Sequence, residues 1–209
     1  MKTRVSPDAS LKLERRHNLL RAICKIGILS ALAAVIQLFE IPLFFAPSFY
    51  KLDLSDLIAL LGGFAMGPLA GGVIQLLKNL LNLLLNGTST AFVGEAANFV
   101  TGCLLVVPAA LVYRRWRSRR GAVIGMAVGT LSLTLGGALI NAYIMLPFFS
   151  RFYGMPMSSI IGMGTAINPA ITDLTSLVLL AVVPFNLLKG ILCSVLTLLL
   201  YKRLSRLLH

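Results

Sequence analysis

Apolar residues fill long stretches of the chain, and short polar or basic segments separate them. A membrane-crossing helix needs roughly 20 mostly apolar residues, so each stretch is a candidate span. The stretch 54–85 is too long for one helix, and we expect Gly67-Pro68 to break it, because proline removes a helical hydrogen bond and clashes with the preceding turn. The pattern predicts an all-α integral membrane bundle of six transmembrane helices, over about 21–46, 54–66, 68–85, 92–113, 121–147 and 174–201.

The segments between these helices differ in character. Residues 48–56 are polar and aromatic, residues 86–90 have the composition of a turn, and residues 114–120 are strongly basic. The longer connection over 148–173 contains proline, serine and threonine, and it has room for a short helix.

Composition favours a single membrane domain. The chain is 57% hydrophobic and 12% charged, with a mean hydropathy of +0.88, whereas a soluble domain of this length needs far more charge on its surface. We expect a basic N-terminal segment over 1–20 and a membrane domain over 21–209. The apolar stretch from Ile26 to about Ala46 is too long for a cleaved signal peptide, so the first helix is expected to remain.

The net charge of +12 does not indicate a nucleic-acid partner. Most basic residues lie before or at the start of the first predicted helix, in the segment 114–120, or after the last helix. Basic residues collect on the cytoplasmic side of membrane proteins. Six spans with both termini in the cytoplasm place all three basic clusters on that side, and the lipid bilayer is the expected surrounding.

No catalytic or metal-binding grouping is present in the sequence. The three cysteines (Cys24, Cys103 and Cys193) are far apart in apolar stretches, and the two histidines (His17 and His209) lie near the chain ends. No phosphate-binding G-x-x-x-x-G-K-[ST] loop, HExxH motif or internal repeat is apparent. The sequence predicts neither an enzyme nor a self-sufficient pump.

Polar residues inside predicted spans are costly and are therefore candidates for function. In the predicted topology the polar groups of four helices, with Asn82 and Asn86 for the third, converge on the outer half of the bundle, which predicts a pocket open to the outside and suited to a polar and aromatic small molecule. They are Gln75, Lys78, Asn79, Asn82 and Asn86 in the third helix, Glu95 and Asn98 in the fourth, Asn141 and Tyr143 in the fifth, and Asn186 and Lys189 in the sixth.

Structural roles compete with this interpretation. Amide side chains often join helices to one another, and Lys78 could form an ion pair with Glu95. Lys189 has no acidic neighbour in the sequence, which favours ligand contact for Lys189 and Asn186. Asp53 and Asp56 are expected to cap the second helix, since acidic groups stabilise helix N-termini.

Small residues recur at four-residue spacing in two places. The pairs Gly27/Ala31 and Ser30/Ala34 occur in the first helix, and the series Gly63, Gly67 and Gly71 spans the next break. Such spacing lets helix backbones approach closely, either within the chain or at an interface with another subunit.

The order of several motifs resembles the substrate-binding S components of energy-coupling factor (ECF) transporters over about residues 20–205. Two of them are KLDLSD at 51–56 and GGFAMGPLAG at 62–71. Lys78-Asn79 and Gly94-Glu95-Ala-Ala-Asn98-Phe99 follow in the same order. Asn141-Ala-Tyr143 with Pro147, and Pro184-Phe-Asn186-Leu-Leu-Lys189-Gly190, resemble the riboflavin-specific branch of that family.

The resemblance implies a six-helix subunit of the bacterial plasma membrane that binds riboflavin from outside as a transported ligand and has no cofactor. Its partners would be a transmembrane coupling protein and two cytoplasmic ABC-type ATPases, with Gly27, Ala31 and Ala34 against the coupling protein. The residues expected to bind the ligand are Leu52, Lys78, Glu95, Asn98, Asn141, Tyr143, Asn186 and Lys189.

Three alternatives stay open at this point. The chain could be an S component for another vitamin or for a flavin nucleotide, although only Lys51 and Arg151 are available at the outer mouth for a phosphate. It could be a stand-alone proton-coupled transporter with Lys78 and Glu95 as the relay, or a structural membrane protein without a ligand.

Overall fold

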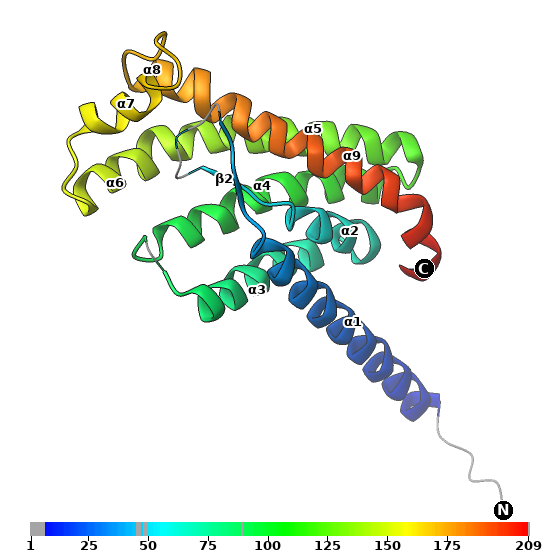
Figure 1. The fold of residues 1–209 in the computed structure, drawn as a ribbon. Coiled ribbons are helices and arrows are strands. Elements are labelled where there is room, and N and C mark those ends of the chain that lie inside the picture. Colours follow the sequence, from blue (N-terminus) through cyan, green and yellow to red (C-terminus); the bar gives the residue numbers. More distant parts are fainter. Residues whose placement is uncertain (1–6, 45–46, 48–49, 89, 209) are drawn as a thin grey trace, which may run out of the picture.

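The chain folds as a bundle of helices with one very short hairpin (Figure 1). The structure is a computed structural model that describes residues 7–44, 47, 50–88 and 90–208. The first six residues of the segment predicted over 1–20, and residues 45–46 at the end of the first predicted helix, lie outside this range. The helices are α1 (Pro7–Gln37), α2 (Asp56–Met66), α3 (Pro68–Asn86), α4 (Val93–Arg115), α5 (Arg119–Ile140), α6 (Leu146–Phe152), α7 (Met157–Thr165), α8 (Leu174–Leu177) and α9 (Val183–Leu208), with π-helical turns η1 (Asn141–Met145) and η2 (Val178–Val182).

The first helix begins earlier and ends earlier than predicted. It starts at Pro7, so residues 7–20 are helical and continuous with the rest of α1. It ends at Gln37, and the chain then forms β1 (Ile41–Pro42), which pairs antiparallel with β2 (Lys51–Leu52). The apolar composition of 38–46 concealed this change, but Pro42 disfavours a helical conformation at the residue before it. We call residues 38–55 the crossing segment, because the described part of it passes across the bundle between α1 and α2 (Figure 1).

Among the described residues, five helical stretches are long and apolar enough to cross a membrane: Glu14–Gln37, Pro68–Asn86, Val93–Arg115, Arg119–Phe152 and Leu174–Leu200. The helix α2 has 11 residues and rises about 16 Å, which is shorter than a hydrocarbon layer of about 30 Å. The all-α membrane bundle agrees with the prediction, whereas the count of six spans and the side on which the termini lie stay predictions. A short helix in the connection over 148–173, α7, is also present.

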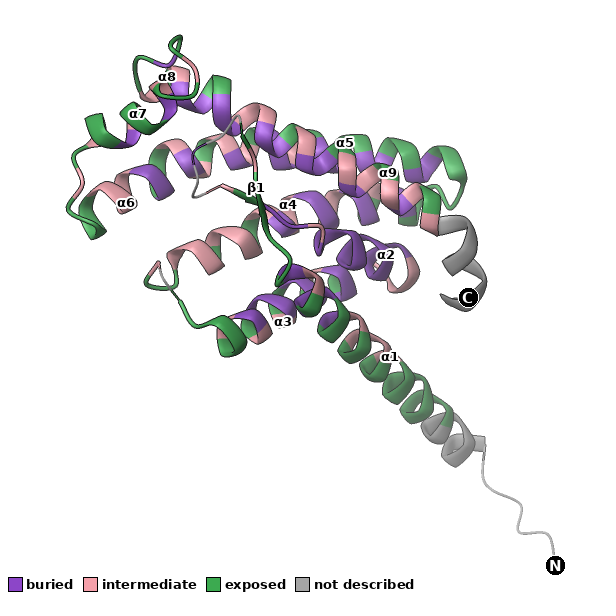
Figure 2. Ribbon diagram, viewed as in Figure 1, coloured by how far each residue is buried: buried purple, intermediate pink, exposed green. Residues whose placement is uncertain are grey.

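Close packing of α2 against its neighbours explains the glycine series. Figure 2 shows that α2 is almost entirely buried. A Cβ on Gly71 would lie 3.1 Å from Cα of Gly63 and 2.5 Å from Val106, so a larger residue would push α3 away from α2 and α4. Between the two helices Gly67 has φ +101°, which only glycine adopts readily, and the break predicted at Gly67-Pro68 is confirmed.

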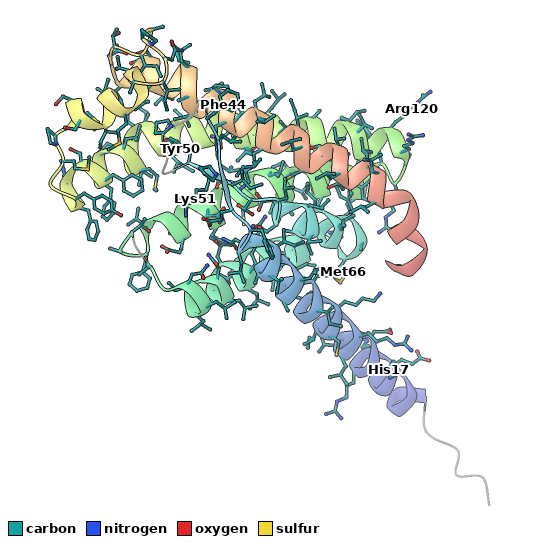
Figure 3. All side chains as sticks on the ribbon, viewed as in Figure 1. His17, Phe44, Tyr50, Lys51, Met66 and Arg120 are labelled. Carbon is teal, nitrogen blue, oxygen red and sulfur yellow. The ribbon has the colours of Figure 1, made fainter. Side chains whose placement is uncertain are left out.

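The two ends of the bundle differ in chemistry. Arg120, at the start of α5, lies far from Tyr50 and Lys51 of the crossing segment (Figure 3). The basic segment 114–120 follows the last turns of α4, whereas the polar residues of α4 lie in its first turns. The polar residues within the spans therefore lie toward one end of the bundle, and the basic segment 114–120 lies at the other end.

Candidate ligand-binding site

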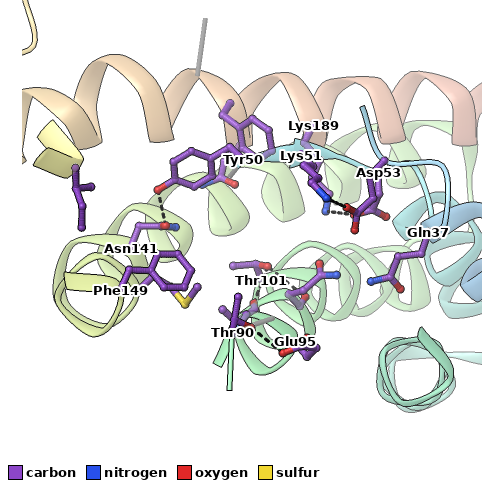
Figure 4. Close-up of a pocket in the computed structure, with 18 of the residues that line it drawn as sticks. Gln37, Tyr50, Lys51, Asp53, Thr90, Glu95, Thr101, Asn141, Phe149 and Lys189 are labelled. Carbon is purple, nitrogen blue, oxygen red and sulfur yellow. Dashed lines mark hydrogen bonds and ion pairs between the residues drawn. The ribbon is translucent and has the colours of Figure 1, made fainter. Parts of the chain in front are cut away.

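A pocket of about 490 Å³ opens under the crossing segment (Figure 4). This volume lies in the range of small-molecule sites. The residues that line it come from most elements at this end of the bundle: Gln37, Glu40, Tyr50, Lys51, Asp53, Asn82, Thr90, Gly94, Glu95, Ala97, Asn98, Thr101, Asn141, Met145, Phe149, Tyr153, Met155, Ile160, Met163, Phe185, Asn186 and Lys189.

Five of the eight residues predicted to bind the ligand come together in this pocket, namely Glu95, Asn98, Asn141, Asn186 and Lys189. The other three do not line it. Leu52 is buried against Phe185, and Lys78 is fully buried behind the pocket. Tyr143 is 77% exposed on the outer surface of the bundle, because the turn that brings Asn141 inward turns Tyr143 outward.

Asn186 lines the pocket and has a buried side-chain donor that is not used. Its side chain is 5% exposed, and Nδ2 has no hydrogen-bond partner among the described residues. Leaving a buried amide donor unpaired costs free energy, which a ligand with a suitably placed acceptor would recover. Space for this side chain exists because residue 137 is glycine: a Cβ there would lie 2.5 Å from Asn186 Nδ2.

Asn141 is held in one orientation by two hydrogen bonds. Its Nδ2 donates to the Gly137 carbonyl across 2.8 Å, and its Oδ1 accepts from the Tyr50 hydroxyl across 2.7 Å. Burial raises the pKa of Tyr50 well above its ordinary value, so the phenol keeps the proton that it donates. These bonds fix which end of the Asn141 amide faces the ligand.

Two π-helical turns direct pocket residues inward. The turn η1 contains Asn141 and Met145, and η2 ends three residues before Phe185. Each turn lies just before a proline, Pro147 or Pro184, which lacks a backbone N–H and clashes with the carbonyl four residues earlier. The extra residue in a π turn relieves this conflict and rotates the helix, a device frequent at functional sites.

The buried ion cluster of Asp53, Asp56, Lys78 and Lys189 lies beside the pocket, and two of its members, Asp53 and Lys189, line the pocket. Lys189 Nζ lies 3.0 Å from Asp53 Oδ2 and 3.0 Å from Asp56 Oδ2. Lys78 Nζ pairs with Asp56 Oδ1 and donates to Ser55 Oγ across 2.6 Å. Two carboxylates and two ammonium groups balance each other, and charges this deeply buried are tolerated only in such paired form.

This cluster corrects two predictions. Lys189 does have acidic partners, and they were missed because Asp53 lies 136 residues away in the sequence. Lys78 pairs with Asp56 and not with Glu95, whose Oε2 instead accepts hydrogen bonds from the Thr88 and Thr90 hydroxyls at 3.1 and 3.0 Å. A Lys78–Glu95 proton relay therefore has no geometric basis.

Asp56 lies in the first turn of α2, as expected for an acidic residue at a helix N-terminus, and its carboxylate also pairs with Lys78 and Lys189. Asp53 does accept from the backbone N–H of Ser55 across 3.0 Å, just before the helix begins. Burial favours the neutral form of Asp53, but the cations of Lys189 and Lys78 lower its pKa below the ordinary value, so it is ionised.

Aromatic side chains supply the apolar part of the site. Tyr50 lies 5.3 Å from Phe185, measured between ring centroids, and Phe149 lies 5.8 Å from Tyr153. All four line the pocket, and a flat ring system can pack among them. The polar groups and the rings together suit a planar molecule with a polar edge and hydroxyl groups.

Several lining residues were missed in the sequence. Gln37, in the last turn of α1, is buried and donates to Asn79 Oδ1 across 3.4 Å, while its Oε1 has no partner among the described residues. In the sequence, Gln37 could have been recognised as a candidate because it is a single amide residue at the end of an apolar stretch. Tyr50 could be found only from the fold, because a crossing segment rich in turns gives no direction for its side chains.

The small residues of α1 divide into two groups. Gly27 and Ala31 are exposed on the surface, and Gly27 has open space beside it. Ala34 is 2% exposed because it packs inside the chain, so its predicted place at a partner interface is not available in this structure.

The chemistry of the site is that of binding. Within the described part of the chain, no group of three or more histidine, cysteine, aspartate or glutamate side chains could hold a metal ion. A pocket of amide, aromatic and paired charged groups at one end of a membrane bundle defines the class: a membrane protein that captures a small molecule. The chain belongs to the substrate-specific components of ECF transporters, whose family model matches residues 21–201.

Curated relatives and a solved structure agree with this family. The riboflavin transporter RibU of Staphylococcus aureus (strain TCH60) is 33% identical over 194 residues, which cover 93% of this chain and 94% of the relative. The riboflavin transporter FmnP of Bacillus subtilis (strain 168) is 29% identical over 86% of this chain and 90% of its own. A solved S component of a bacterial ECF transporter superposes with a TM-score of 0.71 at 31% identity, covering 91% of this chain and 98% of that one.

Proposed function

We propose that this chain is the riboflavin-binding subunit of an ATP-driven ECF importer in a bacterial plasma membrane. It spans the membrane six times with both termini in the cytoplasm, binds the vitamin on the outer side, and releases it inside. The observation that supports the proposal is the meeting of Asn141, Asn186 and Lys189 with aromatic side chains in one pocket. The names of the curated relatives, riboflavin transporters, supply the identity of the ligand.

The side chains divide the ligand between them. Asn186 and Lys189 donate to carbonyl oxygens at the polar edge of the flavin ring, and Asn141 binds the same edge in the orientation that Tyr50 fixes. Glu95 and Asn98 accept from the hydroxyl groups of the ribityl chain. We leave Leu52, Lys78 and Tyr143 out of the contact set because they do not line the pocket.

Energy for transport comes from partners. The chain docks through the exposed face of α1 around Gly27 and Ala31 to a transmembrane coupling protein, which associates with two cytoplasmic ABC-type ATPases. Small residues four apart let another helix approach closely. The chain itself performs no catalysis, and riboflavin is cargo and not a cofactor.

Titration of the purified chain with riboflavin, followed by quenching of flavin fluorescence, tests the proposal. Asn186→Ala should weaken riboflavin binding by about ten- to a hundredfold. This is the expected cost of leaving a buried acceptor of the ligand without its hydrogen-bond donor. Leu187→Ala is the matched control, since that side chain is partly exposed on the lipid-facing surface and should leave the affinity unchanged. Equal affinities in the Asn186 variant and the parent chain would remove this residue from the site.

A further inference from the structure

The pocket carries more acidic than basic groups. Among the lining residues the carboxylates are Glu40, Asp53 and Glu95, and the ammonium groups are Lys51 and Lys189. The two remaining members of the buried ion cluster, Asp56 and Lys78, balance each other. One negative charge is therefore in excess.

Neither ammonium group in the lining is available to a new anion. Lys51 Nζ lies 2.9 Å from Glu40 Oε2 at the rim of the pocket. Lys189 lies between Asp53 and Asp56, at 3.0 Å from an oxygen of each. An anionic ligand group would have to take one of these cations away from a carboxylate that is already bound to it.

The unbalanced charge belongs to Glu95. Its carboxylate accepts hydrogen bonds only from Thr88 and Thr90 within the described chain, and no cation lies beside it. Two of the N–H groups at the start of α4, which could otherwise attract an anion, are also occupied: Gly94 N–H donates to Thr90 Oγ1 and Phe92 N–H donates to Thr88 Oγ1, each across 3.0 Å.

We propose, building on the function proposed above, that Glu95 and the rim pair Glu40–Lys51 make this pocket select an uncharged, hydroxyl-bearing flavin over its phosphate ester. Glu95 accepts hydrogen bonds from ligand hydroxyls and repels a phosphate placed at the end of the same chain. Glu40 keeps Lys51 from pairing with that phosphate. The ligand class is thus a neutral molecule, and the two glutamates determine the specificity.

The expected size of the effect follows from Coulomb's law. A unit charge about 10 Å from a phosphate in a partly buried site changes its affinity on the order of tenfold. The affinity for a neutral ligand changes much less through charge alone. The ratio of the two dissociation constants therefore isolates the electrostatic contribution, because any general damage to the pocket weakens both ligands.

The test is titration of the purified full-length chain with riboflavin and with riboflavin 5′-phosphate at neutral pH and low salt. In the parent chain the ester should bind at least about tenfold more weakly. Glu95→Gln and Glu40→Gln should each reduce this ratio by several-fold to tenfold, and Asn98→Asp, which adds a carboxylate one turn along α4, should increase it. Glu40 lies at the rim, so its variant is expected to fold even where a change at Glu95 impairs folding.

Equal affinity of the parent chain for both flavins would overturn the inference, as would an unchanged ratio in both glutamine variants. These results leave the proposed function intact, because riboflavin still binds. A parent chain that binds neither flavin contradicts the proposed function itself.

Discussion

The Tyr50 hydroxyl donates to Asn141 Oδ1 across 2.7 Å, and this bond joins the crossing segment to the turn η1. The two residues are 91 positions apart in the sequence. The bond places an aromatic ring over the pocket and fixes the Asn141 amide in the same step. The crossing segment is consequently part of the binding site and more than a connection between helices.

Tyr50→Phe removes this bond and keeps the ring. Without the hydroxyl, Asn141 can reorient, and we expect riboflavin to bind about three- to tenfold more weakly, as for the loss of one neutral hydrogen bond. The raised pKa of Tyr50 keeps the phenol protonated in alkali, so the ratio of affinities between variant and parent should stay constant from about pH 7 to pH 10. An ionised phenol can no longer donate to Asn141, so the parent chain would then bind riboflavin no better than the variant. Equal affinities of variant and parent already below about pH 10 would show that the phenol ionises in its ordinary range.

Gly137→Ala tests the packing that positions Asn186. The added Cβ would lie 2.5 Å from Asn186 Nδ2, so the amide must move away from its place in the pocket. We expect riboflavin affinity to fall by about tenfold or more, with α5 still helical because alanine favours helix. Gly72→Ala is the control, since its nearest neighbour would be 3.9 Å away. Comparable losses in the two variants would mean that Gly137 has no particular relation to the ligand.

The buried ion cluster predicts a pattern of stability in which a double change is milder than either single change. Lys78→Met leaves one carboxylate in excess, and Asp56→Asn leaves one ammonium group in excess, so each should cost about 3–5 kcal/mol. The combined variant keeps the ion pair of Asp53 and Lys189, which has no net charge, and should recover much of the lost free energy of unfolding. Thermal unfolding in detergent measures this, and additive destabilisation in the double variant would contradict the charge balance described here.

The sequence predicted the bundle well because membrane helices carry a strong local signal. Apolar length and Gly67-Pro68 located α3, α4 and the long stretches through α5 and α9 to within a few residues. The end of α1 could not be found in the same way, since residues 38–46 are as apolar as the helix before them. Only the pairing of β1 with β2, which depends on the fold, separates them.

The candidate site was predicted from polar residues within apolar spans. Such residues alone do not show which side chains already form ion pairs or hydrogen bonds within the chain. Asn141 and Asn186 were found because an amide inside a span is costly wherever it lies. The partners of Lys189 were missed because they come from the crossing segment and α2, far away in the sequence. Tyr143 was assigned to the pocket together with Asn141, but residues two apart in a helix do not share a face, and Tyr143 lies exposed on the surface.

The exposed face of α1 makes a separate prediction about coupling. Ala31→Trp should block ATP-driven uptake in proteoliposomes that contain the coupling protein and the ATPases, because the indole prevents close approach of another helix. Riboflavin affinity should be unchanged, since Ala31 does not line the pocket. Leu69→Trp is the matched control on an exposed position of α3 and should retain uptake. Equal uptake by both variants would place the coupling surface elsewhere.

The most direct test of the central claim is the flavin content of the chain purified in mild detergent, read by absorbance and fluorescence after denaturing release. Trp116 lies within the basic segment 114–120 and does not line the pocket, so the ligand itself is the better reporter. We expect riboflavin to be bound at close to one molecule per chain, either as purified or after incubation with the vitamin. A chain that contains no flavin and takes up none on titration would contradict the central claim.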